Sequence, residues 1–249
     1  MKTTPLKKSL VIAAVFGLGS VSFTQAAVPF SDNFSASHNY FTNGVAGTGW
    51  DGIVNSGAMG AGSVAGGGSL NWETAGNTQW DNGKSDAALL YLSVVGDFSA
   101  SVQITNVANG GFPNAGLLAL DPGNMGDWAY NDYHFNDNNV FFNSVNGVVP
   151  GGGNPAVSPR GGYVRLDRVG TTFSAYSKVN SGDSWRFIGS VDRGAEMPTT
   201  INLGLTAASY SGTATTATFS NFSVVPEPAS AMLVMAGVGM LAMRRKRSV

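Results

Sequence analysis

The chain has 249 residues and a formal net charge of −1, with 12% charged residues, 34 glycines and no cysteine. The lack of cysteine excludes disulfides, thiol nucleophiles and thiolate metal sites. Seven of the 14 basic residues lie at the two ends, so the body between the ends keeps seven basic residues against 14 acidic ones. We expect no nucleic-acid partner, because phosphate binding needs clustered lysine and arginine and this acidic body has no basic stripe.

The first 26 residues have the pattern of a secretory signal peptide. Three lysines occur within the first eight residues, an apolar stretch runs from Leu10 to Val21, and the small residues Thr24 and Ala26 follow it. This order is typical of signal peptides, and the apolar stretch is short for a permanent membrane span. We therefore expect residues 1–26 to direct export as a signal helix and to be removed after Ala26.

Residues 27–224 have the pattern of an all-β body. From Phe98, apolar residues at every second position alternate with Ser, Gln and Thr up to residue 105, which is the period of a half-buried strand. No window of twelve or more residues repeats apolar side chains at helical spacing, so we predict an antiparallel two-sheet sandwich. The glycine-rich segment 43–68 is expected to be a surface excursion without a rigid strand throughout. Further strands are expected over 116–123, 139–147, 161–192 (three strands), 201–210 and 216–225.

The segment around residue 165 adds a resemblance to a known superfamily. Arg165, Leu166, Arg168 and Gly170 form an R-L-x-R-x-G strand, and Phe173, Ala175, Tyr176 and Trp185 follow in an F-x-A-Y strand and after a polar turn. Residues 89–224 thus resemble small bacterial members of the concanavalin A-like lectin/glucanase superfamily. This resemblance implies a jelly-roll sandwich but no single activity. Arg165 and Arg168 have opposite strand parity, so they should face opposite ways, and Trp185 is expected in the core.

The body lacks the residue sets of the common hydrolases. Several glycosidases of that superfamily carry a Glu-x-Asp-x-x-Glu strand, because retaining hydrolysis needs two carboxyl groups about 5 Å apart. This chain has three glutamates, Glu73, Glu196 and Glu227, and none lies in such a pattern. His38 and His134 are the only imidazole bases, and no Gly-x-Ser-x-Gly elbow occurs. We expect a protein that is not an enzyme.

The segment 121–139 is the strongest candidate for a binding site in the body, since it combines carboxylates, amides and aromatic rings. Its oxygen atoms could bind calcium, which is the only candidate cofactor, although the EF-hand spacing is absent. Its rings and polar groups would instead suit a sugar. The third interpretation is that Trp128, Tyr130 and Phe135 are inward residues of a strand. The calcium candidates are Asp121, Asn124 and Asp127; the glycan candidates are Trp128, Tyr130, Asn131, Asp132, Tyr133 and His134.

The last segment, 225–249, has the pattern of a sorting signal. Pro226, Glu227 and Pro228 enforce an extended entry. Residues 229–243 then carry no charge and would span about 22 Å as a helix, short of the ~30 Å hydrocarbon layer. A basic end follows at Arg244, Arg245, Lys246 and Arg247, which predicts a short transmembrane helix with its C-terminus inside.

This tail closely resembles the PEP-CTERM sorting signal of Gram-negative bacteria. The resemblance implies recognition by an exosortase, passage through the inner membrane and delivery to the cell surface or extracellular matrix, often together with exopolysaccharide. We therefore expect an exported, non-enzymatic protein that uses the secretion machinery and binds glycan or exopolysaccharide through a lectin-like sandwich. The alternatives are a structural surface or biofilm protein without a small ligand and, third, a glycan-active hydrolase.

Overall fold

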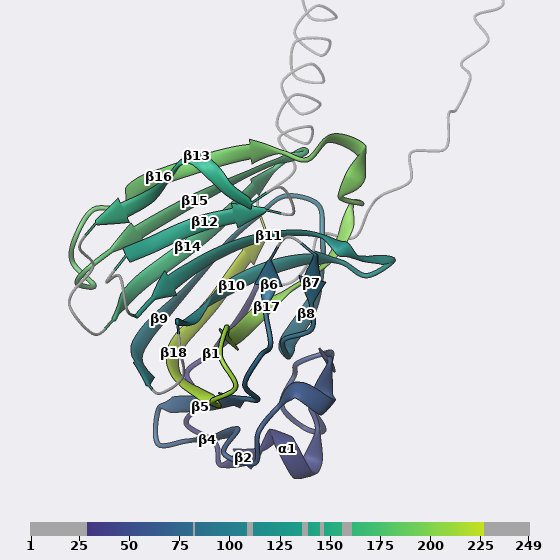
Figure 1. Cartoon of the computed structure of the whole chain (residues 1–249), viewed down its shortest axis with the longest axis vertical. Coiled ribbons are helices and arrows are strands. Elements are labelled where there is room, and N and C mark those ends of the chain that lie inside the picture. The colour runs from purple at the N-terminus through teal and green to yellow at the C-terminus, as the bar shows by residue number, and fades with distance from the viewer. Residues whose placement is uncertain are drawn as a thin grey trace, which may run out of the picture.

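The computed structural model describes residues 29–81, 83–108, 112–135, 139–144, 147–155 and 161–226. Within these residues the chain forms two antiparallel sheets that face each other, with one small hairpin against the outer face of one of them (Figure 1). The predicted all-β two-sheet antiparallel sandwich is confirmed. The signal peptide and the tail from Glu227 onward, including the expected transmembrane helix, lie outside the described residues.

Sheet A has nine strands and contains the predicted alternating strand near its middle. In that strand Phe98, Ala100, Val102 and Ile104 are buried, and the polar residues between them face outward. The order across the sheet, with β1 (Phe30–Asp32) also pairing with β18, is β16 (Arg186–Asp192), β15 (Thr172–Lys178), β14 (Gly162–Val169), β9 (Phe98–Ala108), β18 (Thr215–Pro226), β5 (Ser69–Thr74), β4 (Val64–Gly66) and β2 (His38–Asn39).

Sheet B has seven strands and lies nearer the viewer in Figure 1. Its strands also pair antiparallel throughout. The order across the sheet is β13 (Gly147–Pro155), β12 (Asn139–Ser144), β11 (Asn124–His134), β10 (Pro113–Asp121), β17 (Thr200–Ser209), β8 (Leu89–Val95) and β3 (Gly52–Val54).

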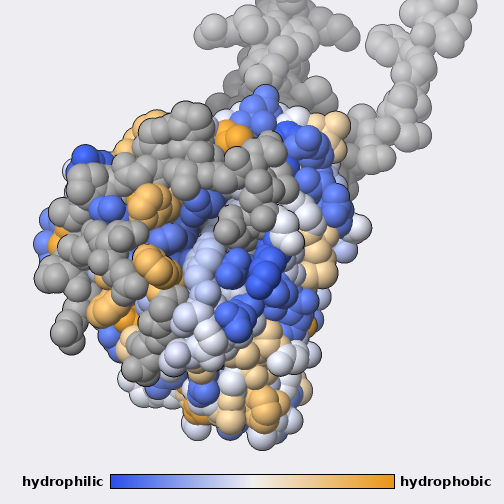
Figure 2. Space-filling view, viewed as in Figure 1, coloured by the Kyte–Doolittle hydropathy of each residue, from blue (hydrophilic) through white to orange (hydrophobic). Residues whose placement is uncertain are grey.

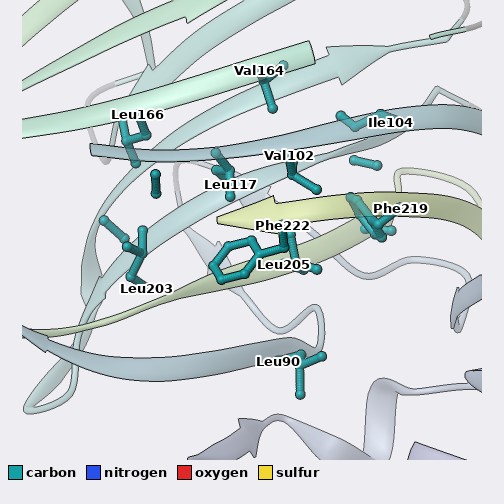
Figure 3. Close-up of a cluster of buried hydrophobic side chains, with 14 of the residues drawn as sticks. Leu90, Val102, Ile104, Leu117, Val164, Leu166, Leu203, Leu205, Phe219 and Phe222 are labelled. Carbon is teal, nitrogen blue, oxygen red and sulfur yellow. The ribbon is translucent and has the colours of Figure 1, made fainter. Parts of the chain in front are cut away.

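The main core fills the space between the two sheets. Figure 3 shows Val102, Val164 and Phe219 from sheet A together with Leu117 and Leu205 from sheet B. Each of these side chains is at most 1% exposed, so each contributes roughly 1.5–3 kcal/mol relative to an exposed position. The apolar residues that alternate along the sequence therefore hold the two sheets together by ordinary apolar burial.

A second apolar cluster lies on the outer face of sheet B. The hairpin of β6 (Trp80–Asp81) and β7 (Lys84–Ser85) places Trp80 against Leu118, Leu120 and Trp128. The indole nitrogen of Trp80 donates to Thr206 Oγ1 at 2.9 Å, and that hydroxyl donates to the Ala88 carbonyl at 2.7 Å. The chain thus covers part of its own sheet face with a short hairpin.

The structure refines three details of the expected fold. The glycine-rich segment 43–68 contributes β3 and β4, and Trp50 within it is 4% exposed, so part of it is sheet. The helical elements of the described residues are short turns, namely α1 (Tyr40–Asn43), η1 (Ser56–Ala58) and η2 (Gly194–Glu196). The last strand includes Pro226, which pairs with Phe98, one residue beyond the expected end at Val225. Over the described part of the chain, no helix has the length and apolarity needed to span a membrane.

Candidate functional site

The predicted glycan residues lie on one strand, β11, and therefore alternate between its two faces. Trp128, Tyr130, Asp132 and His134 face outward from sheet B, whereas Asn131 and Tyr133 face the core. Trp128, Tyr130 and Tyr133 are each 1% exposed. The six side chains therefore do not form one exposed stacking face. Of the three residues interpreted as inward, Phe135 packs against the main core, whereas Trp128 and Tyr130 are buried in the outer cluster.

The outward part of β11 is closed by its neighbours. Trp128 and Tyr130 belong to the cluster under Trp80. Figure 2, viewed as in Figure 1, shows a hydrophilic surface over this part of the face, where Lys84 and Asp86 are exposed. Burial, with a smaller contribution from Asp132, raises the pKa of Tyr130 well above its usual value. A sugar cannot stack on these two rings unless the hairpin moves.

Asp132 is the centre of a small polar cluster on the same face. Asn143 donates to one carboxylate oxygen at 2.8 Å, and His134 Nε2 lies 2.5 Å from the other. The Tyr130 hydroxyl donates to Asn114 Oδ1 at 3.0 Å. Because Asp132 is fully buried and already holds two partners, this arrangement fixes the strands β10, β11 and β12 to each other.

The calcium candidates lie at the turn between β10 and β11, where they bond to the protein itself. Asp121 Oδ1 accepts from the Gly123 amide at 2.7 Å, and Asn124 donates to Asp127 Oδ2 at 2.6 Å. The other Asp127 oxygen pairs with Arg193 at 3.1 Å. Within the described ranges, no three His, Cys, Asp or Glu side chains are grouped to hold a metal ion. The turn is therefore built from local hydrogen bonds and one ion pair.

An alternating row of aromatic and cationic side chains lies on the outer face of sheet A, at the edge formed by β14, β15 and β16. We call it the aromatic–cation row. All six members are half-buried or exposed, and Phe187 is 55% exposed. The row consists of Phe187, Tyr176, Arg165, Trp185, Lys178 and Tyr163.

Each member of the row contacts the next. The guanidinium of Arg165 lies over the rings of Tyr176 (4.1 Å) and Trp185 (5.1 Å). The amine of Lys178 lies over Trp185 (4.7 Å) and Tyr163 (5.1 Å). Tyr176 meets Phe187 edge to face at 5.5 Å. Cation–π contacts of this kind contribute about 0.5–1 kcal/mol each at exposed sites, so the rings are held in place before any ligand arrives.

The sheet register explains why these residues meet. Tyr163 lies opposite Lys178, and Arg165 lies opposite Tyr176, so both pairs project from the same face of β14 and β15. A bulge after Ala175 shifts the pairing of β15 with β16 and brings Phe187 opposite Tyr176. The row is thus carried by paired strands and not by a loop.

Sequence reasoning placed Trp185 in the core, and this was wrong. Trp185 follows a turn at Asn180–Asp183 and lies half-buried on the outer face, where it contacts two cations. The prediction for the two arginines is confirmed: Arg165 faces outward and pairs with Asp167 at 3.0 Å, whereas Arg168 is 3% exposed and donates to backbone carbonyls. Burial lowers the pKa of Arg168.

A polar strip borders the aromatic–cation row on β9 and β18. Ser99 donates to Asp167 at 2.7 Å, and Gln103 Oε1 accepts from Ser220 and Asn221 at 3.2 and 3.0 Å. Hydroxyl and amide groups therefore continue the flat face beyond Arg165. Apolar rings beside a few positioned polar groups are a combination found in small-molecule sites.

Asn131 supports the row from inside the sandwich. Its amide nitrogen crosses the core and donates to the carbonyls of Arg165 (2.8 Å) and Tyr176 (3.0 Å). These two residues form the opposed pair at the centre of the row. Asn131, one of the predicted glycan residues, thus fixes β14 and β15 to each other beneath the centre of the row.

Comparisons with known proteins agree with the fold. No protein-family model matches the chain, and no curated protein matches it. A solved structure of a functionally unknown protein from Saccharomyces cerevisiae is 15% identical with a TM-score of 0.54, over 65% of this chain and 90% of that one. The GH43 protein BlXynB from Bacillus licheniformis, in a mutant form, is 14% identical with a TM-score of 0.58, over 79% of this chain and 39% of that one.

A third similar structure is arcelin-5, a lectin-like defence protein from Phaseolus vulgaris. It is 10% identical with a TM-score of 0.49, over 80% of this chain and 98% of that one. At these identities the yeast and Bacillus structures support the two-sheet antiparallel sandwich and no particular activity.

Proposed function

We propose that this protein is an exported glycan-binding protein that acts without catalysis and binds its ligand on the aromatic–cation row. The observation that carries the proposal is the row itself: four aromatic side chains held side by side on a sheet face, each half-buried or exposed. Sugar rings present flat C–H faces that stack on such rings, and the adjoining hydroxyls and amides can bond sugar hydroxyls. The proposed fold is the concanavalin A-like jelly roll.

The carboxylates of the body support a role without catalysis. Glu73 accepts from the Gly62 amide at 2.8 Å, and Glu196 pairs with Arg193 at 3.0 Å. Asp132 is buried with its two partners on the other sheet. Retaining glycoside hydrolysis needs two carboxyl groups facing one another across a groove, and these residues serve local structure instead.

The sorting proposal depends on the tail sequence. The PEP-CTERM resemblance at Pro226, Glu227 and Pro228 implies an exosortase partner, an inner-membrane intermediate and final delivery to the cell surface or matrix of a Gram-negative bacterium. Replacing Glu227 with alanine and following the protein in membrane and extracellular fractions would test this proposal. Unchanged fractionation of Glu227→Ala would contradict the proposal.

Binding of soluble polysaccharides to the purified full chain, measured by affinity electrophoresis or calorimetry, tests the glycan proposal. Phe187→Ala should weaken binding by about tenfold or more, as expected when an aromatic anchor is truncated. Phe41→Ala is the matched control, because Phe41 is 50% exposed and lies in α1 at the far end of the molecule from the row (Figure 1). Equal effects of the two substitutions, or no binding to any polysaccharide, would favour the alternative of a structural surface protein without a small ligand.

A further inference from the structure

The basic side chains of the described body are unevenly placed. Arg168 and Arg193 are buried, each 3% exposed, and Lys84 lies on the small hairpin over sheet B. The other three lie on the β14–β16 edge of sheet A: Arg165, Lys178 and Arg186. In a body with twice as many acidic as basic residues, this edge is where accessible positive charge gathers.

The three cations on this edge differ in whether a carboxylate of the protein already neutralises them. Arg165 pairs with Asp167 at 3.0 Å. Within the part of the chain that the structure describes, Lys178 and Arg186 form no ion pair with a carboxylate. The nearby Asp183 carboxylate accepts two hydrogen bonds from Asn180, at 2.8 and 3.1 Å. Two cations on this edge are therefore available to an external anion.

Lys178 is the better placed of the two. Its amine lies over the rings of Trp185 and Tyr163 and donates to the Ser181 carbonyl at 2.5 Å. An ammonium group has three N–H donors, so the bond to Ser181 leaves donors for a ligand. The positive charge thus lies directly beside the aromatic surface on which a sugar ring would stack.

From this juxtaposition we infer that the ligand is an acidic polysaccharide whose sugar rings carry carboxylates, that is, a uronate-bearing polymer. The inference rests on the proposed function and adds the charge of the ligand to it. A uronate places its carboxylate on the same ring that stacks, so one sugar unit can contact an aromatic ring and the Lys178 ammonium together. Arg186 pairs with Ser177, whose side chain is buried, so Arg186 projects from the opposite face of this edge and Lys178 is the cation beside the rings.

Electrostatics make the inference testable. The acidic body repels a polyanion at long range, whereas Lys178 attracts it over a few ångströms. Added salt screens exposed charges beyond about 8–10 Å and weakens charge-assisted contacts. We therefore expect affinity for the acidic polymer to fall as salt rises, with no comparable change for a neutral polymer.

The experiment compares polygalacturonate with the same polymer after chemical reduction of its carboxyl groups, using the purified full chain. Tighter binding of polygalacturonate, with the preference lost at high salt, is the expected result. Lys178→Gln should weaken polygalacturonate binding about five- to tenfold more than it weakens binding of the reduced polymer. Lys84→Gln is the control, because it removes the same charge from an exposed site on the other sheet and should change neither.

The possible failures are distinguishable. Equal binding of the two polymers would overturn the inference and leave the proposed function standing. No binding of either polymer would overturn both. Dextran sulfate serves as a further arm, since binding as tight as that of polygalacturonate would show a general response to polyanions and overturn the carboxylate assignment. Equal losses from Lys178→Gln and Lys84→Gln would also overturn it.

Discussion

Gly116 is a position where a single methyl group should damage the sandwich clearly. It lies on β10 between two paired strands, opposite Asp132 on β11 and Thr206 on β17. A Cβ at this position would lie 2.1 Å from the Asn131 carbonyl oxygen and 2.7 Å from the Asp132 Cα. Ordinary van der Waals contacts begin near 3.4 Å, and both obstructing atoms are backbone, so no side chain can rotate away. Gly116→Ala must push β11 away from β10.

The magnitude follows from that overlap. Overpacking a core costs typically 1–3 kcal/mol, and a clash with backbone on a ladder that is paired on both sides should reach about 3 kcal/mol. For a body of this size, 1 kcal/mol lowers the melting temperature by about 2–4 °C. We therefore expect Gly116→Ala to melt about 6–12 °C below the parent chain, measured by thermal unfolding followed with near-UV circular dichroism.

Gly182→Ala provides the matched control. Gly182 lies in the exposed turn before β16, and a Cβ there meets nothing within 4 Å. Alanine at an open site reduces the entropy of the unfolded chain and stabilises by up to about 1 kcal/mol. The two substitutions should thus shift the melting temperature in opposite directions. If Gly116→Ala melted within about 2 °C of Gly182→Ala, the close approach of β10 and β11 would be refuted.

Three further substitutions test the buried polar contacts. Tyr130→Phe removes the bond to Asn114 and should cost about 1 kcal/mol at neutral pH. Burial raises the Tyr130 pKa above 10.0, so the contribution of Tyr130 to stability is complete below pH 10 and is lost as the pH rises further. Tyr130→Phe should therefore reduce the decrease of the urea midpoint at alkaline pH; an unchanged decrease would contradict this. Asn131→Leu leaves two carbonyls without their donor and should cost about 2–4 kcal/mol in urea unfolding, and a loss below 1 kcal/mol would argue against the contact across the core. Arg193→Gln breaks the ion pairs with Asp127 and Glu196 and should cost about 3 kcal/mol in urea unfolding. The cost should be nearly equal in 0.1 and 1 M salt because the guanidinium is buried; a cost that disappears in 1 M salt would contradict this reasoning.

The strands that could be predicted from sequence are those whose local pattern agrees with their environment. Phe98 to Ile104 alternate because one face of β9 meets the core and the other meets solvent. The turn after β14 was also predictable, since Gly170 adopts φ +60°, a conformation that favours glycine. In these places the short-range preference and the tertiary structure require the same residues.

The segment after Asp121 shows where local reasoning fails. Its asparagine, aspartate and glycine content indicates a loop, yet Asn124–His134 forms an eleven-residue strand. Pairing with β10 on one side and β12 on the other overrides the weak strand preference of these residues. Because the strand alternates, the six glycan candidates had to divide between two faces, and the hairpin that covers Trp128 comes from residues more than forty positions away.

The aromatic–cation row needs long-range information of another kind. Its members come from three strands, and their contacts depend on the register that the turn at Gly170 and the bulge after Ala175 impose. A partial signal was present: Tyr163 and Arg165, like Tyr176 and Lys178, are two residues apart and so share a face. Only the pairing of β14 with β15 shows that these two pairs of side chains lie on the same face of sheet A.

The two faces of the sandwich are linked through Asn131, and this link bears on binding. A buried amide that holds the carbonyls of Arg165 and Tyr176 fixes the backbone under the centre of the row. The cations between the rings then fix the side chains above it. A surface ordered in advance loses less conformational entropy when a ligand binds. The residue that sequence reasoning assigned to direct sugar contact is thus better placed to keep the opposite face rigid, and the affinity of the row for a repeating glycan should depend on that rigidity as well as on the exposed rings.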